Sequence, residues 1–267
     1  MTAGLVHEEA HHGLFGPGSV TWRVHADPLM GLATLRALLL QVLHPAGQAT
    51  VFAAGDRIDD PWARVARLLR YVGVITFGSS AEAIMAAARL RALHAQVGGT
   101  RSNGQSFRGD DEDLVLWMHC CQVTSFLDVV HRGGLALSSG QRDAYLSEQV
   151  RTAVAWGLDP GDVPDCQRTL TRYFRRTRGE LSMTAHARIF MDAVIEPAVP
   201  ELMMLAQRNH PAWAPAAGLA FASLPAWAQR FYGIRPSSGP AAFASAATTV
   251  ALHSVRDGLL ERPVQHS

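Results

Sequence analysis

The amino-acid sequence predicts an all-α protein folded as a single domain over residues 1–267. Three observations predict it: helix caps recur along the chain, apolar residues repeat at helical spacing, and glycine or proline follows the apolar runs. No segment alternates polar and apolar residues long enough to demand a sheet, so we expect at most a short hairpin between Gly99 and Gly109. Residues 1–18 are expected to form a flexible tail.

Capping residues indicate where the helices begin. Two Asp-Pro pairs, at positions 27–28 and 60–61, predict helix starts, because aspartate caps exposed N–H groups and proline is tolerated in the first turn. Ser79 and Glu82 form a capping box. The segment 110–132 is apolar almost all round, which predicts a central, buried helix. The expected helices span 27–44, 60–77, 79–97, 110–132, 138–156, 165–178, 184–195, 200–209 and a last segment ending near Leu260.

Composition excludes several classes of function. The net charge of +1 and the lack of a helix-turn-helix signal argue against nucleic-acid binding. All 24 basic residues are arginine, and without lysine the chain cannot anchor pyridoxal phosphate. Three cysteines without CxxC spacing, and no signal peptide, predict a cytoplasmic protein. No segment reads as a transmembrane helix; peripheral membrane contact and the oligomeric state stay open.

His119 is the first candidate site residue. Helical spacing places it on one face with Val115, Leu116, Val123 and Phe126. An imidazole among apolar side chains needs a hydrogen-bond partner or a metal. Two interpretations remain open at this point: a core histidine bonded to a backbone carbonyl, or an axial ligand to haem iron.

A cluster of arginines on the 60–77 segment forms the second candidate site. Arg64, Arg67, Arg70 and Tyr71 are three or four residues apart, so they neighbour one another on a helix. They form either a solvated edge beside the apolar stripe or a cationic group that binds haem propionates or polarises a distal ligand.

His44 and His94 lie near helix ends, where they are either structural caps or ligands. Together with Glu148 they could form a non-haem metal site in a helical bundle, although the Glu-x-x-His pair usual in such sites is missing. The string from His7 to His11 matches HExxH, but its place in the predicted tail favours a solvated segment over a zinc helix.

Several strings together resemble the MpaB-like oxygenases, the haem-binding relatives of latex clearing protein. They are SVTWRVHADPLMGLATLRALLLQVLHP, DDPWARVARLLRYVGVITFG, RLRALHAQVGG, SFRGDDEDLVLWMHCCQVTSFL and DAYLSEQ. The match runs from about Ser19 to Gly233. In two respects the chain departs from the rubber-cleaving branch: Arg70 and Tyr71 stand where that branch has lysine and threonine, and no glutamate occurs between Ala46 and Asp60.

The resemblance implies a globin-like helical core that holds a b-type haem non-covalently. It implies His119 as the axial iron ligand, with Arg67 and Arg70 near the distal side, and His44 and His94 as rival ligands. The leading hypothesis is therefore a bacterial haem-dependent oxygenase, or peroxidase-like enzyme, which uses dioxygen or peroxide on a lipophilic small molecule. The alternatives are a non-catalytic haem- or lipophile-binding protein, and a non-haem metal enzyme using His44, His94 and Glu148. For the substrate we expect a tunnel, with the 211–229 segment at its entrance.

Overall fold

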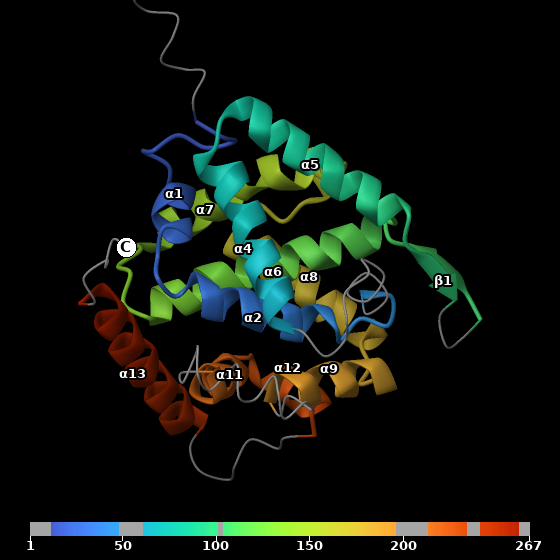
Figure 1. The fold of residues 1–267 in the computed structure, drawn as a ribbon. Coiled ribbons are helices and arrows are strands. Elements are labelled where there is room, and N and C mark those ends of the chain that lie inside the picture. Colours follow the sequence, from blue (N-terminus) through green and yellow to red (C-terminus); the bar gives the residue numbers. More distant parts are fainter. Residues whose placement is uncertain (1–11, 48–60, 101–103, 196–212, 234–240, 262–267) are drawn as a thin grey trace, which may run out of the picture.

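The computed structural model describes residues 12–47, 61–100, 104–195, 213–233 and 241–261 (Figure 1). Their regular secondary structure is almost entirely helical, which confirms the predicted all-α class. The helices are α1 Val20–His25, α2 Met30–Gln41, α4 Pro61–Phe77, α5 Ser80–Ala95, α6 Glu112–Arg132, α7 Ser139–Ala155, η2 Pro160–Asp162, α8 Gln167–Thr177, η3 Arg178–Glu180, α9 Ala185–Ile195, α11 Trp213–Ala222, α12 Ala226–Phe231 and α13 Ala241–Leu260; the strands are β1 Gly98–Thr100 and β2 Ser106–Arg108.

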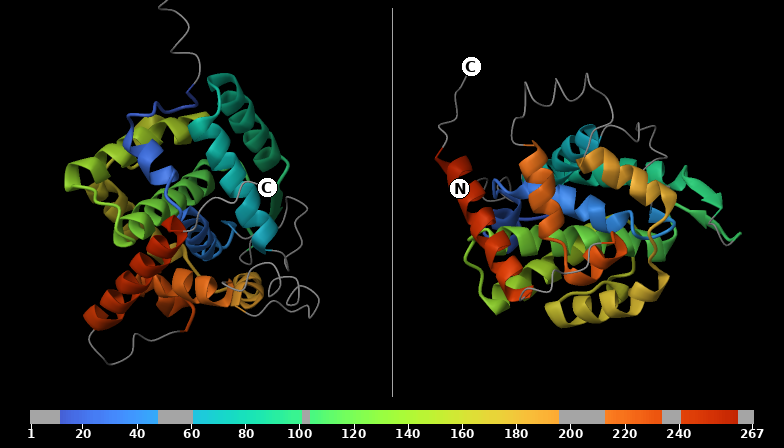
Figure 2. Two further views of the ribbon diagram at one scale, coloured as in Figure 1. Left: turned by 60° about the vertical axis from the view of Figure 1, so that its left-hand side comes forward. Right: turned by 90° about the horizontal axis from the view of Figure 1, so that it is seen from below.

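Helix α6 is the core of the molecule, as its apolar sequence predicts. Every residue from Leu114 to Val130 except Thr124 and Asp128 is buried. Helix α2 packs along it, with α4 and α5 on one side and α9 and α11–α13 on the other (Figures 1 and 2). By length and composition α6 could also cross a membrane, but 83% of its most apolar window is buried inside the protein.

Several predicted helix ends and the hairpin are confirmed. Ser79 and Glu82 form the predicted capping box of α5, and Ser138 caps α7. Strands β1 and β2 form an antiparallel hairpin with Gly99 opposite Phe107, and it projects from the body of the molecule (Figures 1 and 2). Helix α13 ends at Leu260, as expected. The predicted 200–209 helix and the HExxH string lie outside the described residues.

The first Asp-Pro prediction is wrong in detail. Helix α2 begins at Met30 rather than at Pro28. The Asp27 carboxylate accepts a hydrogen bond from the Leu29 N–H at 3.0 Å and pairs with Arg256 at 2.8 Å. A short-range bond of this kind forms a turn in place of a first helical turn.

The predicted tail is shorter than residues 1–18. Gly13 and Leu14 donate backbone hydrogen bonds to the carbonyls of Gly78 and Ile75, at 2.6 and 2.8 Å. Phe15 is 1% exposed. An aromatic side chain that packs into the core holds these residues against α4, an effect that the glycine-rich sequence around them does not reveal.

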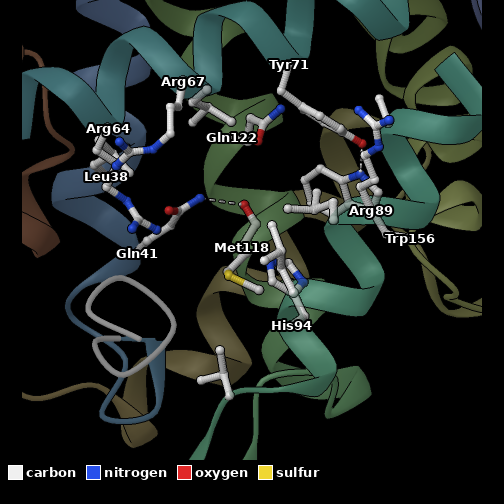
Figure 3. A pocket seen from close by; sticks show the side chains of 15 residues that line it. Leu38, Gln41, Arg64, Arg67, Tyr71, Arg89, His94, Met118, Gln122 and Trp156 are labelled. Atoms are coloured by element: carbon white, nitrogen blue, oxygen red, sulfur yellow. Dashed lines mark hydrogen bonds between the residues drawn. The ribbon is translucent and has the colours of Figure 1, made fainter. Parts of the chain in front are cut away.

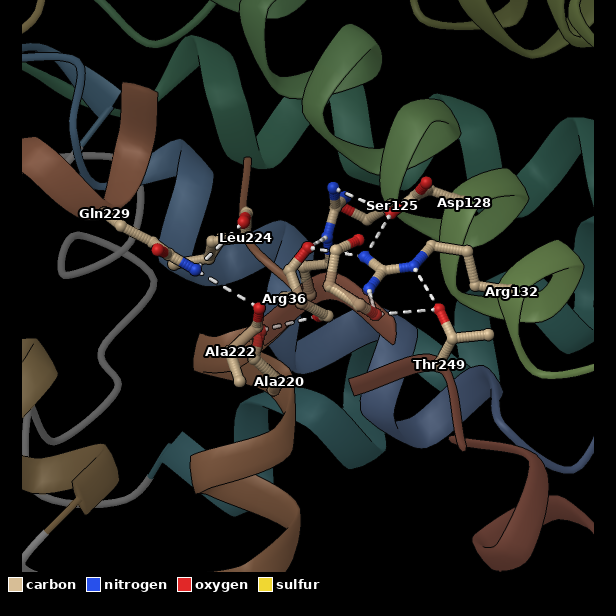
Figure 4. A network of polar contacts seen from close by, with 11 residues as sticks. Arg36, Ser125, Asp128, Arg132, Ala220, Ala222, Leu224, Gln229 and Thr249 are labelled. Carbon is tan, nitrogen blue, oxygen red and sulfur yellow. Dashed lines mark hydrogen bonds and ion pairs between the residues drawn. The ribbon is translucent and has the colours of Figure 1, made fainter. Parts of the chain in front are cut away.

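A buried arginine joins the C-terminal helices to the core (Figure 4). The Arg36 guanidinium, on α2, donates to the Ser125 hydroxyl at 2.8 Å and to the Ser223 carbonyl at 3.1 Å. It also pairs with Asp128 at 3.2 Å. Arg132 extends the network to Thr249 on α13. The fold therefore depends on a charged network at the junction of α2, α6, α11 and α13.

We expect Arg36→Ala to lower the free energy of unfolding by about 2–3 kcal/mol, because the buried Ser125 hydroxyl loses its bond to the guanidinium and the Ser223 carbonyl keeps only the longer bond from Arg132, at 3.4 Å. The partly exposed Asp128 keeps Arg132 and solvent, which limits the loss. Urea denaturation measures the change. Arg108→Ala, which removes an exposed pair with Asp110, is the control and should leave stability unchanged. An Arg36 variant as stable as the wild type would contradict this account of the network.

Candidate cofactor-binding cavity

A cavity of about 520 Å³ lies between α2, α4, α5 and α6, beside the end of α7 (Figure 3). Its size is typical of sites that bind cofactors or small molecules. Aliphatic side chains contribute much of its wall, and the polar groups come from four helices and Trp156. The lining residues are Leu38, Gln41, Arg64, Arg67, Leu68, Tyr71, Ala86, Arg89, Leu90, Leu93, His94, Val97, Met118, Gln122 and Trp156.

The charged residues of the cavity are basic. Arg64 and Arg67 come from α4 and Arg89 from α5, and no aspartate or glutamate is among the described residues that line the space. Spacing of three residues puts Arg64 and Arg67 on one side of α4, as the sequence predicts. Three guanidinium groups around a largely apolar space favour a ligand that combines an apolar body with carboxylates.

His94 lies in the cavity wall as a neutral imidazole. Burial lowers its pKa from 6.5 to about 4, and the charge of Arg64 acts in the same direction. An imidazole with this pKa is unprotonated at neutral pH, so a ring nitrogen has a lone pair for a metal. The structure thus provides a candidate iron ligand on α5, across the cavity from Arg64 and Arg67 of α4 (Figure 3).

Tyr71 and Trp156 form a hydrogen-bonded pair at the cavity. The Trp156 indole N–H donates to the Tyr71 hydroxyl oxygen at 2.6 Å. Burial raises the pKa of Tyr71 to about 12, so the phenol keeps its proton at neutral pH. Because the indole can only donate, the Tyr71 O–H proton remains to be donated elsewhere, and the phenol borders the cavity.

Sequence reasoning missed several polar or sulfur-bearing residues of the cavity. The Gln41 side-chain amide donates to the Met118 carbonyl at 3.1 Å, which joins α2 to α6. Gln122 lines the same space. Each glutamine follows directly on apolar residues, in LLLQ and CCQ, a signal that could have identified it. Nothing in the sequence pattern singles out Arg89 or Trp156.

His119 lies outside the cavity lining. It is 1% exposed, its ring meets the Trp156 ring edge-on at 5.7 Å between centroids, and neither ring nitrogen has a hydrogen-bond partner among the described residues. Burial lowers its pKa from 6.5 to about 4. Met118 lines the cavity, and the next residue of a helix points roughly 100° further round. The side chain therefore lies behind Trp156 rather than in the cavity wall.

Other predicted site residues are not brought together. Arg70 is exposed on α4 and does not line the cavity. The His44 ring accepts a hydrogen bond from the Ala46 N–H at 3.2 Å, in the capping role that the sequence left open. The Glu148 carboxylate accepts from the N–H groups of Val20 and Thr21, at 3.1 and 2.7 Å, and so binds the start of α1.

The structure gives no support to the two remaining expectations about the site. In the described part of the chain, no group of three or more His, Cys, Asp and Glu side chains could hold a metal ion, so the proposed His44, His94 and Glu148 site does not form. The described residues 213–229, expected at a tunnel entrance, do not contribute to the cavity.

Comparison with known proteins identifies one family. The family model described as "ER-bound oxygenase mpaB/B'/Rubber oxygenase, catalytic domain" matches residues 22–253. This range includes every residue that lines the cavity. No curated protein and no solved structure matches the chain.

Proposed function

The chain belongs to the family of mpaB and rubber oxygenase catalytic domains, and on that premise we propose that it is a haem b-dependent oxygenase acting on a lipophilic small molecule. In this proposal the haem occupies the cavity between α2, α4, α5 and α6, and His94 is the iron ligand. One observation carries it: a neutral imidazole and three arginines border the same largely apolar space.

The residues present fit a b-type haem. Its flat, apolar ring matches the aliphatic part of the wall, and its two carboxylates match guanidinium groups. Bound haem iron would supply the capacity to bind and activate dioxygen or peroxide. Arg64 and Arg89 are suited to pair with the carboxylates, while His94 is suited to hold the iron.

Two further side chains are suited to handle the oxidant. Arg67 offers N–H donors that carry a fixed positive charge, and such donors stabilise negative charge that develops on oxygen. Tyr71 offers an O–H donor, because Trp156 already uses its oxygen as an acceptor. This assigns to Tyr71 a donor role at the position where the rubber-cleaving branch usually has threonine.

We propose His94 rather than His119 as the iron ligand. His119 contacts the Trp156 ring, but it is not among the residues that line the cavity, whereas His94 is. The substrate class follows from the wall itself: Leu38, Leu68 and Leu90, with no acidic residue among the described lining, favour an apolar molecule over a polar one.

Titration with haemin tests whether the protein binds haem. We expect the purified protein to bind one haem per chain, with a Soret band that saturates at equimolar ratio. The bound haem should also support oxidation of an isoprenoid or fatty-acyl probe. Saturable binding without turnover would favour the haem- or lipophile-binding alternative. A colourless protein with stoichiometric zinc or iron would contradict haem binding altogether.

The sequence groups Arg67 with Arg70, but we expect their replacement to have different effects on the rate of reaction with peroxide. Arg67→Ala is expected to retain haem but react about tenfold or more slowly with peroxide, because it removes a donor at the cavity. Arg70→Ala is the matched control on the same helix and should react at the wild-type rate. Stopped-flow absorbance measures both rates. Equal rates for the two variants would place Arg67 outside the reaction.

A further inference from the structure

The outer face of α5 is unusual for the surface of a protein. Surface helices normally turn polar residues outward. On α5 the exposed outward residues are instead apolar, and Ile84 and Met85 are 63% and 53% exposed. The exposed apolar residues of this outer face are Ala81, Ile84, Met85, Ala88, Ala92 and Ala95, whereas Glu82, Arg89, Arg91 and Leu93 are exposed beside it. The helix lies at the periphery of the molecule in both Figure 1 and Figure 2.

These six residues form one continuous surface. At roughly 100° per residue they occupy an arc about 100° wide along the whole helix. Arg91 stands at one edge of the arc and Arg89 at the other, and both are exposed. Long arginine side chains at the margins of an apolar strip can reach polar groups above it while their stems lie on the strip.

Most of the charged side chains around this surface are arginines, although the exposed Asp110 lies near His94 at the end of α5. Arg67 and Arg70, on the adjoining α4, are exposed as well. Glu82 is the one acidic residue of α5, and its carboxylate is already bound by the backbone and side chain of Ser79. An apolar strip surrounded by arginines is complementary to a layer of acyl chains and anionic headgroups.

The cavity wall adjoins one margin of this surface. Arg89 stands at that margin and Leu93, which is 50% exposed, lies next to it, and both residues line the cavity. A molecule that leaves a lipid layer beneath α5 would therefore have only a short way to the cavity along the same helix.

We propose that the outer face of α5 docks the protein on an anionic lipid surface and admits the lipophilic substrate from that surface to the cavity. The substrate transfer rests on the proposed function, whereas the docking does not. A second copy of this chain is a poorer occupant, because a symmetric contact through α5 would bring its arginines together.

Vesicle flotation tests the docking. The wild-type protein should float with vesicles of phosphatidylcholine and phosphatidylglycerol, and bind pure phosphatidylcholine vesicles at least about tenfold more weakly. The double variant Ile84→Glu/Met85→Glu should lose at least about tenfold in binding to the anionic vesicles. It should keep the wild-type circular dichroism spectrum and haem content, because both side chains point away from the cavity.

The control is Val250→Glu, on α13, where the replaced side chain is 66% exposed. Helix α13 also presents apolar residues, but Asp257 and Glu261 are exposed at its end. If Val250→Glu removes binding and the α5 variant does not, α5 is not the docking surface. The proposal is also overturned if the wild-type protein does not bind vesicles. In that case, a wild-type dimer that the α5 variant converts to a monomer would identify a second copy of the chain as the occupant of this face. A wild-type monomer would instead indicate that a different protein occupies it. Vesicle binding does not require haem, so this failure is distinguishable from failure of the proposed function.

Discussion

His94→Ala is expected to weaken haem binding by at least about a hundredfold, because it removes the imidazole that faces the cavity. The substitution should cost little stability, since His94 is only partly buried at the end of α5. Haemin titration, followed at the Soret band, measures the affinity. Circular dichroism and thermal denaturation establish that the variant is folded.

His119→Ala is the matched control for this result. It removes a histidine of the same charge and size from behind Trp156, and it should destabilise the protein by about 2–3 kcal/mol through the space left in the core. Its haem affinity should remain within about tenfold of the wild type. If His119→Ala loses haem while His94→Ala keeps it, the ligand is His119, as the sequence resemblance implies.

Acid should destabilise the protein strongly between pH 7 and pH 5. Burial lowers the pKa of His25 from 6.5 to about 3, and it lowers the pKa values of His94 and His119 from 6.5 to about 4. Between each folded value and 6.5, the unfolded chain binds a proton that the folded chain does not, so stability falls as the pH falls. Each histidine should cost about 2 kcal/mol at pH 5 relative to pH 7. Urea denaturation at several pH values measures the slope.

The variant His25→Gln measures how much one histidine contributes to the pH dependence of stability. The His25 ring contacts the Thr76 hydroxyl at 2.7 Å and the Tyr145 hydroxyl at 3.2 Å, and a glutamine amide offers both a donor and an acceptor in its place. We expect this variant to lose about a third of the pH dependence, because His94 and His119 keep their contributions. His253→Gln, at an exposed position on α13, is the control and should keep all of it. An unchanged slope in His25→Gln would show that His25 is protonated in the folded protein.

Much of the fold could be predicted from the sequence because its signals are local. The capping box of Ser79 and Glu82 and the apolar 112–132 segment specify their helices without reference to the rest of the chain. The exceptions depend on contacts between distant segments. Phe15 packs into the core, and Asp27 pairs with Arg256, which lies 229 residues further along.

The sequence could predict which site residues share a face of one helix, but not which residues of different helices meet at the cavity. Spacing placed Arg64, Arg67 and Tyr71 on one side of α4, and all three line the cavity. It could not establish how α6 is rotated against α4 and α5. The most apolar helix favoured His119, which is the more deeply buried histidine, and spacing alone did not show that His94 borders the cavity.

The most direct test of the central claim is chemical rescue of iron ligation. His94→Gly and His119→Gly proteins, each loaded with haem, would be titrated with free imidazole while the absorption spectrum and the iron–nitrogen stretch in the resonance Raman spectrum are recorded. If His94 is the ligand, only the His94→Gly protein loses that stretch, and imidazole restores both its Soret band and a stretch that shifts with isotopically labelled imidazole. Loss and rescue in the His119→Gly protein, with no change in His94→Gly, would contradict the account.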